Sequence, residues 1–365
     1  MKYCFGVDIG GTTVKMGLFE ETGDIVEKWE IVTRTEDEGK AILPDIAAAI
    51  EEKLKVCKIG GEDVLGVGVG VPAPVTEAGV VNGSANLGWK YKEVKRELEE
   101  LTGFSVQVGN DANVAALGEM WKGGGAGQKN MIMVTLGTGV GGGVIIGGKV
   151  IIGEHGAGGE IGHLCVNYEE TENCGCGNRG CLEQYASATG IVRIAKKKLV
   201  SKTRPTVLCA ETVTAKDVFD AVKEGDQVAQ EIAEEFGSYL GYALANLAVV
   251  ADPSVFVIGG GVSKAGEILI PYIQKPYRER AFFANKDVEF KLATLANDAG
   301  ICGAAKLLLD GRAKDVLLPS AAGSAVGRIP AGNGRDFRTT DTDIRSGTAD
   351  PGSGRETGRT GRGKR

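Results

Sequence analysis

The sequence predicts an α/β fold of two domains, and three observations lead to this expectation. The chain has 365 residues, about twice the usual length of one domain. Apolar strand-like runs alternate with helical patterns over residues 1–313. The order strand, glycine turn, strand occurs at residues 3–20 and again at 131–148, which indicates two related halves that face each other.

The elements of the first half follow from the spacing of apolar residues and from turn signals. Ile42, Ile46, Ile50 and Leu54 are four residues apart and form a helical stripe, and Gly103 is a helix stop signal. We expect strands at 3–9, 13–20, after the turn at 22–24, at 64–72 and at 105–109. We expect helices at 42–57, at 92–103 and from Asn110 onward.

The second half continues the same alternation. Strands are expected at 131–136, at 144–148, at 254–261 and at 288–295, and helices near 182–199, 214–223, 226–250, 264–280 and 299–310. A boundary near residue 112 would give a smaller first domain of 1–112 plus about 299–312. The larger second domain would then be 113–298.

Composition excludes several classes of protein. The 57 glycines follow no three-residue period, which excludes a collagen-like chain. The net charge of −6 does not suggest nucleic acid or an anionic membrane as partner. No leader pattern and no membrane-length apolar run are present, so we expect a cytoplasmic protein.

Residues 314–365 differ from the rest of the chain. They hold 10 basic and 6 acidic residues and one aromatic residue after Leu318, whereas residues 1–313 carry a net charge of −10. Such a segment has too little apolar surface to fold. We expect a disordered tail there.

Two glycine turns predict a phosphate-binding site. The sequence from Gly137 to Gly142 has the pattern G-x-G-x-x-G, but a strand follows it where a dinucleotide-binding turn needs a helix. The glycines of both turns would let backbone N–H groups approach a phosphate, and the threonines would add hydroxyl donors. The expected nucleotide-binding residues are Gly10, Gly11, Thr12, Thr13, Thr135, Gly137, Thr138 and Gly139. A single turn of this kind is more often a plain hairpin, so the pair carries the prediction.

Asp8 ends the first strand beside the first glycine turn. A carboxylate there would repel a phosphate unless Mg²⁺ stood between them, and Mg²⁺ commonly binds carboxylates together with phosphate oxygens. Asp8 is therefore assigned to positioning the metal and the nucleotide. Lys15 is added as a nucleotide contact, with a solvated strand lysine as the alternative.

A cluster of cysteines predicts a structural zinc site. His163, Cys174, Cys176 and Cys181 have the spacing H-x10-C-x-C-x4-C, which fits a tetrahedral site of three thiolates and one imidazole. Four protein ligands leave no position for a reactive water, so the zinc would order a loop. Glu160 and Glu183 flank the cluster, and paired carboxylates suit a ligand with many hydroxyl groups.

Asn110 and Asp111 stand between a strand and a helix. The pair is a normal helix start, but Asp111 is also placed to accept a hydroxyl proton during phosphoryl transfer, with Asn110 orienting the same substrate. Both interpretations remain open from the residues alone.

The ordered motifs together resemble the ROK family of sugar kinases, and within it the bacterial glucokinases. The matching segments are VDIGGTTVKMG at 7–17, GNDANVAALGE at 109–119, TLGTGVGGG at 135–143, GEHGAGGEIGH at 153–163, CGCGNRGCLE at 174–183 and VIGGGV at 257–262. The resemblance covers about residues 3–312.

The resemblance implies an actin-like, hexokinase-like (ribonuclease H-like) fold with a cleft between two domains. It implies ATP between the glycine turns, with Gly259, Gly260 and Gly261 near the adenosine, and Asp111 as the base. It implies sugar contacts from Asn86, Asn110, Asp111, Glu160, His163 and Glu183, and a homodimer or homotetramer. The expected reaction is phosphorylation of a hexose, foremost glucose to glucose 6-phosphate. Alternatives are a kinase for N-acetylmannosamine, fructose or another hexose, and a sugar sensor without catalysis.

Overall fold

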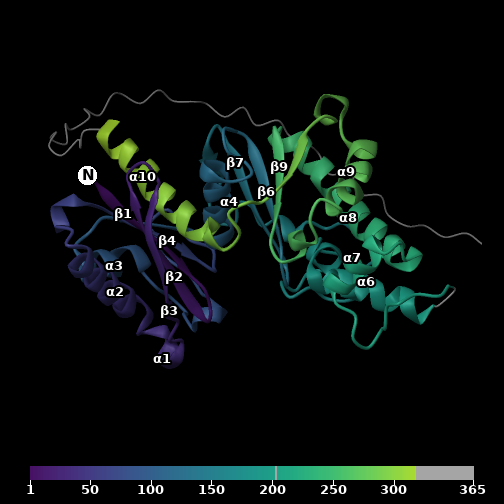
Figure 1. The fold of residues 1–365 in the computed structure, drawn as a ribbon, viewed down its shortest axis with the longest axis horizontal. Coiled ribbons are helices and arrows are strands. Elements are labelled where there is room, and N and C mark those ends of the chain that lie inside the picture. Colours follow the sequence, from purple (N-terminus) through teal and green to yellow (C-terminus); the bar gives the residue numbers. More distant parts are fainter. Residues whose placement is uncertain (202–203, 318–365) are drawn as a thin grey trace, which may run out of the picture. The chain divides into compact units, whose positions relative to one another are not determined.

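The computed structural model describes residues 1–201 and 204–317 (Figure 1). All of them belong to one compact unit, Met1–Pro319. The last helix, α10 (Ala299–Leu317), continues past Lys314, where the tail was expected to begin. Residues 318–365, which make up the rest of the expected tail, lie outside the described part of the chain.

A five-stranded sheet forms the first half, in the order β3-β2-β1-β4-β5. Its strands are β1 (Tyr3–Ile9), β2 (Thr13–Glu20), β3 (Ile25–Val32), β4 (Val64–Val71) and β5 (Val106–Asn110). β1 is antiparallel to β2 and parallel to β4, and β4 is parallel to β5. The central strands are almost fully buried, because both faces of the sheet are covered.

Three helices accompany this sheet: α1 (Glu36–Gly39), α2 (Ile42–Cys57) and α3 (Val94–Thr102). The predicted stripe of α2 is confirmed, since Ile42, Ile46 and Ile50 are buried in the same core as β1 and β4. α3 ends at Thr102 and is capped by Gly103, whose φ of 73° suits glycine.

The second half has a sheet of the same design, in the order β10-β9-β6-β7-β8. Its strands are β6 (Met131–Leu136), β7 (Val140–Ile146), β8 (Lys149–Val150), β9 (Val255–Gly259) and β10 (Glu289–Leu292). β6 is antiparallel to β7 and parallel to β9, as β1 is to β2 and β4. The expected internal repeat is therefore present in the topology.

The helices of the second half are α5 (Glu183–Ala186), α6 (Ala188–Val200), α7 (Ala215–Lys223), α8 (Gln227–Ala251) and α9 (Leu269–Arg280). The single helix expected at 182–199 is wrong, because the chain is extended at Ser187, with ψ 171°. The Ser187 hydroxyl accepts a hydrogen bond from the Gly190 N–H and so begins a new helix.

Two helices join the halves. α4 (Asp111–Lys122) contacts β7 of the second sheet, and α10 contacts β1 and β4 of the first. α4 and α10 lie side by side between the two sheets in Figure 1. They pack closely because Gly118 and Gly303 have no side chains: a Cβ on Gly118 would lie 2.9 Å from the Gly303 nitrogen.

Within the described residues, no helix has both the length and the apolar character needed to cross a membrane.

Candidate active site

A cavity of about 700 Å³ lies among residues of both halves. Ten of the sequence-predicted residues line it: Asp8, Lys15, Asp111, Thr135, Gly137, Gly139, Glu160, His163, Glu183 and Gly260. They come from β1, β2, the start of α4, β6 and the β6–β7 turn, the segment from Glu160 to Glu183 that carries the predicted zinc ligands, and the turn after β9. The fold therefore gathers one chemical site from motifs spread over most of the chain.

The first glycine turn connects β1 to β2. Its Gly10 N–H donates to the Thr13 carbonyl at 3.0 Å, which closes the turn. Thr33, just after β3, holds the turn from behind: its hydroxyl donates to the Gly10 carbonyl at 2.7 Å and its N–H to the Thr12 carbonyl at 2.9 Å. Within the described residues, the N–H groups of Gly11 and Thr12 have no protein acceptor, so they are free to bind a ligand.

The second glycine turn connects β6 to β7, and the Gly137 N–H closes it on the Gly139 carbonyl at 3.0 Å. The carbonyls of Gly137 and Thr138 are bound by the start of α6, through the Ala188 N–H at 2.8 Å and the Thr189 hydroxyl at 2.8 Å. The N–H groups of Thr138 and Gly139 find no acceptor among the described residues. Each turn thus offers backbone donors, as a phosphate site requires.

Asp111 is the first residue of α4 and lies in the wall of the cavity. Burial raises the pKa of its carboxyl from 3.8 to about 6, with further increases from the charges of Asp8 and Glu160. A hydrogen bond from the Ala112 N–H, at 2.7 Å, acts in the opposite direction. A carboxylate with a pKa just below neutral is well suited to take a proton at physiological pH.

Asn110 ends β5 and caps α4. Its Oδ1 accepts hydrogen bonds from the N–H groups of Ala112 and Asn113, and its Nδ2 donates to the Ala73 carbonyl at 3.2 Å. All these contacts are structural, and Asn110 is not among the residues that line the cavity. The helix-start interpretation therefore describes its contacts in this structure, and a sugar contact by Asn110 stays a prediction.

Asn86 also lies outside the wall of the cavity. It belongs to a short 3₁₀ turn (Ala85–Leu87) and is exposed beside the first glycine turn. A Cβ placed on Gly11 would lie 3.4 Å from the Asn86 carbonyl oxygen. Gly10, Gly11, Thr12, Thr13 and Thr138, from the two turns, are likewise outside the cavity wall.

Asp8 and Lys15 are cross-strand partners in β1 and β2. Burial raises the pKa of the Asp8 carboxyl, and the charge of Lys15 opposes that increase. Among the described residues no donor binds the Asp8 carboxylate, which lines the cavity beside Gly300 at the start of α10. A partly buried carboxylate with unused oxygens facing this cavity fits a Mg²⁺ ligand.

The predicted zinc ligands come together. One ligand atom from each of His163, Cys174, Cys176 and Cys181 lies within 4.8 Å of the others. The Sγ atoms of Cys176 and Cys181 are 3.7 Å apart, and Cys174 Sγ is 3.8 Å from His163 Nδ1. Tetrahedral zinc with Zn–S bonds of about 2.3 Å separates its sulfur ligands by about 3.8 Å. The donor set and its spacing therefore fit zinc.

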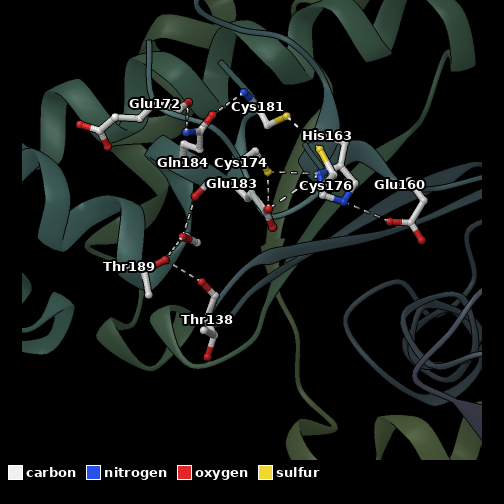
Figure 2. A network of polar contacts seen from close by, with 11 residues as sticks. Thr138, Glu160, His163, Glu172, Cys174, Cys176, Cys181, Glu183, Gln184 and Thr189 are labelled. Carbon is white, nitrogen blue, oxygen red and sulfur yellow. Dashed lines mark hydrogen bonds and ion pairs between the residues drawn. The ribbon is translucent and has the colours of Figure 1, made fainter. Parts of the chain in front are cut away.

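Glu160 and Glu183 lie on either side of His163, as Figure 2 shows. Glu160 Oε2 is 4.0 Å from His163 Nε2, while Glu183 Oε1 is 3.8 Å from His163 Nδ1 and 2.8 Å from Cys174 Sγ. The imidazole thus presents Nδ1 to the thiols and Nε2 to the Glu160 side. This arrangement lets His163 serve a metal and the cavity at once.

The turn after β9 packs directly on the second glycine turn. Gly260 has a φ of 84°, and a Cβ there would lie 2.7 Å from the Leu136 carbonyl carbon, so only glycine fits. The Ser263 hydroxyl donates to the Gly260 carbonyl at 2.8 Å. Gly260, Ser263 and Lys264 line the cavity, whereas Gly259 and Gly261 do not.

Sequence reasoning missed several residues of the site, among them Glu119. Its side chain is fully buried, and its carboxylate accepts hydrogen bonds from the N–H groups of Gly124, Thr294 and Leu295 at 2.8 to 3.1 Å. It thereby ties α4 to the segment after β10, which also lines the cavity. Its place at the end of the GNDANVAALGE motif was the available signal.

Two sheets of the same topology, each with a glycine turn between its antiparallel strands, and a cavity lined by residues of both halves define an actin-like or hexokinase-like phosphotransferase fold. The ROK family model matches residues 4–311, and the chain belongs to this family. It is 44% identical over 309 residues to a glucokinase of Halalkalibacterium halodurans, covering 83% of this chain and 93% of that protein.

Solved structures agree. A ROK family glucokinase from Streptomyces griseus, in complex with glucose and AMPPNP, is 36% identical with a TM-score of 0.66, over 84% of this chain and 98% of that one. A ROK hexokinase from Thermus thermophilus is 33% identical with a TM-score of 0.72, over 86% of this chain and 99% of that one.

Proposed function

We propose that this protein transfers the γ-phosphoryl group of ATP to a hexose, with glucose as the acceptor. The observation that carries the proposal is Asp111, a carboxyl with a pKa of about 6 in a cavity that the second glycine turn lines together with Asp8 and Lys15, which flank the first turn. The similarity to glucokinases supports glucose over other hexoses.

In this reaction the free N–H groups of the two turns bind the phosphates of ATP. Asp111 accepts the proton of the sugar hydroxyl, while that oxygen forms a bond to the γ-phosphorus and the bond from phosphorus to the ADP oxygen breaks. Ionised Asp111 is the dominant form at pH 7, because its pKa lies about one unit lower. Mg²⁺, held by Asp8 together with the phosphates, would supply charge neutralisation.

The sugar would lie against Glu160, Glu183 and the Nε2 side of His163, with Asn86 and Asn110 as more distant candidates. Two carboxylates beside one imidazole support this assignment, because they can accept hydrogen bonds from adjacent hydroxyl groups. Zinc on His163, Cys174, Cys176 and Cys181 would fix the loop that carries these groups. Its role is therefore structural.

A coupled assay of ADP release over a panel of glucose, N-acetylmannosamine and fructose tests the proposal. We expect ATP-dependent turnover with the highest kcat/KM for glucose. Turnover of another hexose at a higher kcat/KM would replace glucose as the substrate. Sugar binding without turnover would indicate a sensor and contradict the proposed kinase.

Further features of the protein are proposed on less direct support. The contacts of α10 with β1 and β4 support a first domain of residues 1–112 plus 299–312. The ligand thiols, which are not joined in disulfides, and the use of ATP support the cytoplasm as the compartment. Exposed Phe282 and Phe283 support a homodimer or homotetramer, which light scattering would test.

A further inference from the structure

We propose that Thr189 is a positioning residue for ATP, which acts through the backbone of the second glycine turn. The inference rests on the proposed function. It begins from a chain of contacts that Figure 2 shows between the cluster of predicted zinc ligands and Thr138. In this chain the Cys174 thiol contacts Glu183, the Glu183 carbonyl accepts from Ser187, and Ser187 contacts Thr189.

The number of hydroxyl protons decides which acceptor the Thr189 hydroxyl binds. Ser187 and Thr189 have two hydroxyl protons between them, but three contacts each require a proton. These contacts are Ser187 to the Glu183 carbonyl at 2.6 Å, Ser187 to Thr189 at 2.9 Å and Thr189 to the Thr138 carbonyl at 2.8 Å. The Thr138 carbonyl has no other donor among the described residues, whereas the Glu183 carbonyl also accepts from the Ser187 N–H at 3.4 Å. Thr189 therefore donates to Thr138.

This bond orients donors on the opposite side of the turn. All peptide bonds of the described chain are trans, and in a trans peptide the C=O and the following N–H point in opposite directions. The Thr189 hydroxyl holds the Thr138 carbonyl toward α6, and the Ala188 N–H holds the Gly137 carbonyl in the same way. The N–H groups of Gly139 and Thr138 then point away from α6, and Gly137 and Gly139 line the cavity.

The side chain of Thr189 does not line the cavity and is exposed. Because the side chain is exposed, its loss leaves no cavity in the core. A preorganised donor costs no reorganisation when the phosphate arrives, so a loosened turn should weaken ATP binding and leave sugar binding unchanged.

The test compares Thr189→Val, which removes the hydroxyl, with Thr189→Ser, which keeps it. Binding of the non-hydrolysable analogue AMPPNP with Mg²⁺ and binding of glucose are measured by calorimetry, and KM and kcat by the coupled assay. We expect Thr189→Val to raise the Kd for AMPPNP and the KM for ATP about 3- to 10-fold, the loss of one hydrogen bond. The KM for glucose and the melting temperature should stay near wild type, and Thr189→Ser should restore nucleotide affinity.

Unchanged nucleotide affinity in Thr189→Val would overturn the inference. So would a parallel loss of ATP affinity, glucose affinity and melting temperature, because that pattern indicates a general structural role. If wild-type protein binds AMPPNP but does not phosphorylate any sugar, the proposed function fails while the binding comparison still tests Thr189.

Discussion

The two glycine turns are held by the same kinds of hydrogen bond, but the residues that donate these bonds come from different parts of the chain. In each, two carbonyls are bound from behind by one backbone N–H and one threonine hydroxyl, and neighbouring N–H groups find no acceptor in the part of the chain that the structure describes. Thr33, which supports the first turn, is 23 residues from Gly10 and is only 7% exposed. Thr189, which supports the second, is 51 residues from Thr138 and exposed.

The difference separates a local support from a distant one. Thr33 follows β3 of the same antiparallel meander that contains the first turn, so the sheet itself places it. Thr189 is placed by α6, which follows α5 and the loop that carries the predicted zinc ligands. Loss of zinc should therefore loosen the second turn and leave the first turn unchanged.

The largest expected effect is the loss of kcat on substitution of Asp111, because the glycine turns offer N–H donors and no group that can accept a proton. Asp111→Asn should lower kcat by about 10²- to 10⁴-fold, the usual contribution of a general base, and leave the Kd values for AMPPNP and glucose nearly unchanged. Glu154→Gln, an exposed carboxylate on the loop before Glu160, is the matched control. Turnover near wild type in Asp111→Asn would remove Asp111 from the mechanism.

The same variant should be more stable than wild type. Asp111 has a folded pKa of about 6, above the ordinary 3.8, so the folded state binds the proton more tightly. Ionisation therefore costs stability as pH rises from about 4 to about 6, and the neutral amide avoids this cost. A higher melting temperature at pH 7.5 would show that lost activity does not come from unfolding.

The next largest effect should come from the zinc cluster. Cys176→Ser removes one of four ligands, so we expect loss of bound zinc by elemental analysis and about a 10- to 100-fold rise in the KM for glucose. Cys165→Ser is the control, because Cys165 is exposed and outside the cluster. A fully active Cys176→Ser protein without metal would contradict the structural role of zinc.

The pH profile gives a smaller effect that isolates Asp111. Because the base must be ionised, kcat/KM for glucose should fall about tenfold per pH unit below a midpoint near 6 and level off above it. The pH dependence of the coupled assay, with the coupling enzymes in excess at each pH, checks this. A midpoint near 4 would mean that burial does not raise the pKa of the working base.

Much of this site could be predicted from the sequence, because its motifs are local. The glycine turns, Asp111 and the cysteine spacing each occupy a few consecutive residues, and the structure brings members of all of them together at one cavity or its flank. Thr33 and Thr189 could not be found in this way. Each acts on backbone groups far away in sequence, and nothing in its neighbouring residues indicates the partner.

The break between α5 and α6 is a related case. The pattern of apolar residues continues through 182–199, so it predicted one helix. Ser187 interrupts it, because its hydroxyl caps α6 and its neighbours bind the second glycine turn. The helix ends because of contacts with a distant turn, and the periodicity of a single segment carries no information about such tertiary contacts.

The smallest expected effect compares the two supports directly. Thr33→Val removes the hydroxyl that binds the Gly10 carbonyl, and we expect a loss of about 1 kcal/mol in stability and a rise of a few-fold in the KM for ATP.

Each of the two variants, Thr33→Val and Thr189→Val, is then combined with Cys176→Ser in a double-mutant cycle. If zinc acts through α5 and α6, the effects of Thr189→Val and Cys176→Ser on ATP affinity should not add, since both loosen the same turn. The effects of Thr33→Val and Cys176→Ser should add within error, since Thr33 follows β3 of the other sheet. Equal additivity in both cycles would show that the second turn is independent of zinc and would remove the difference between the two supports.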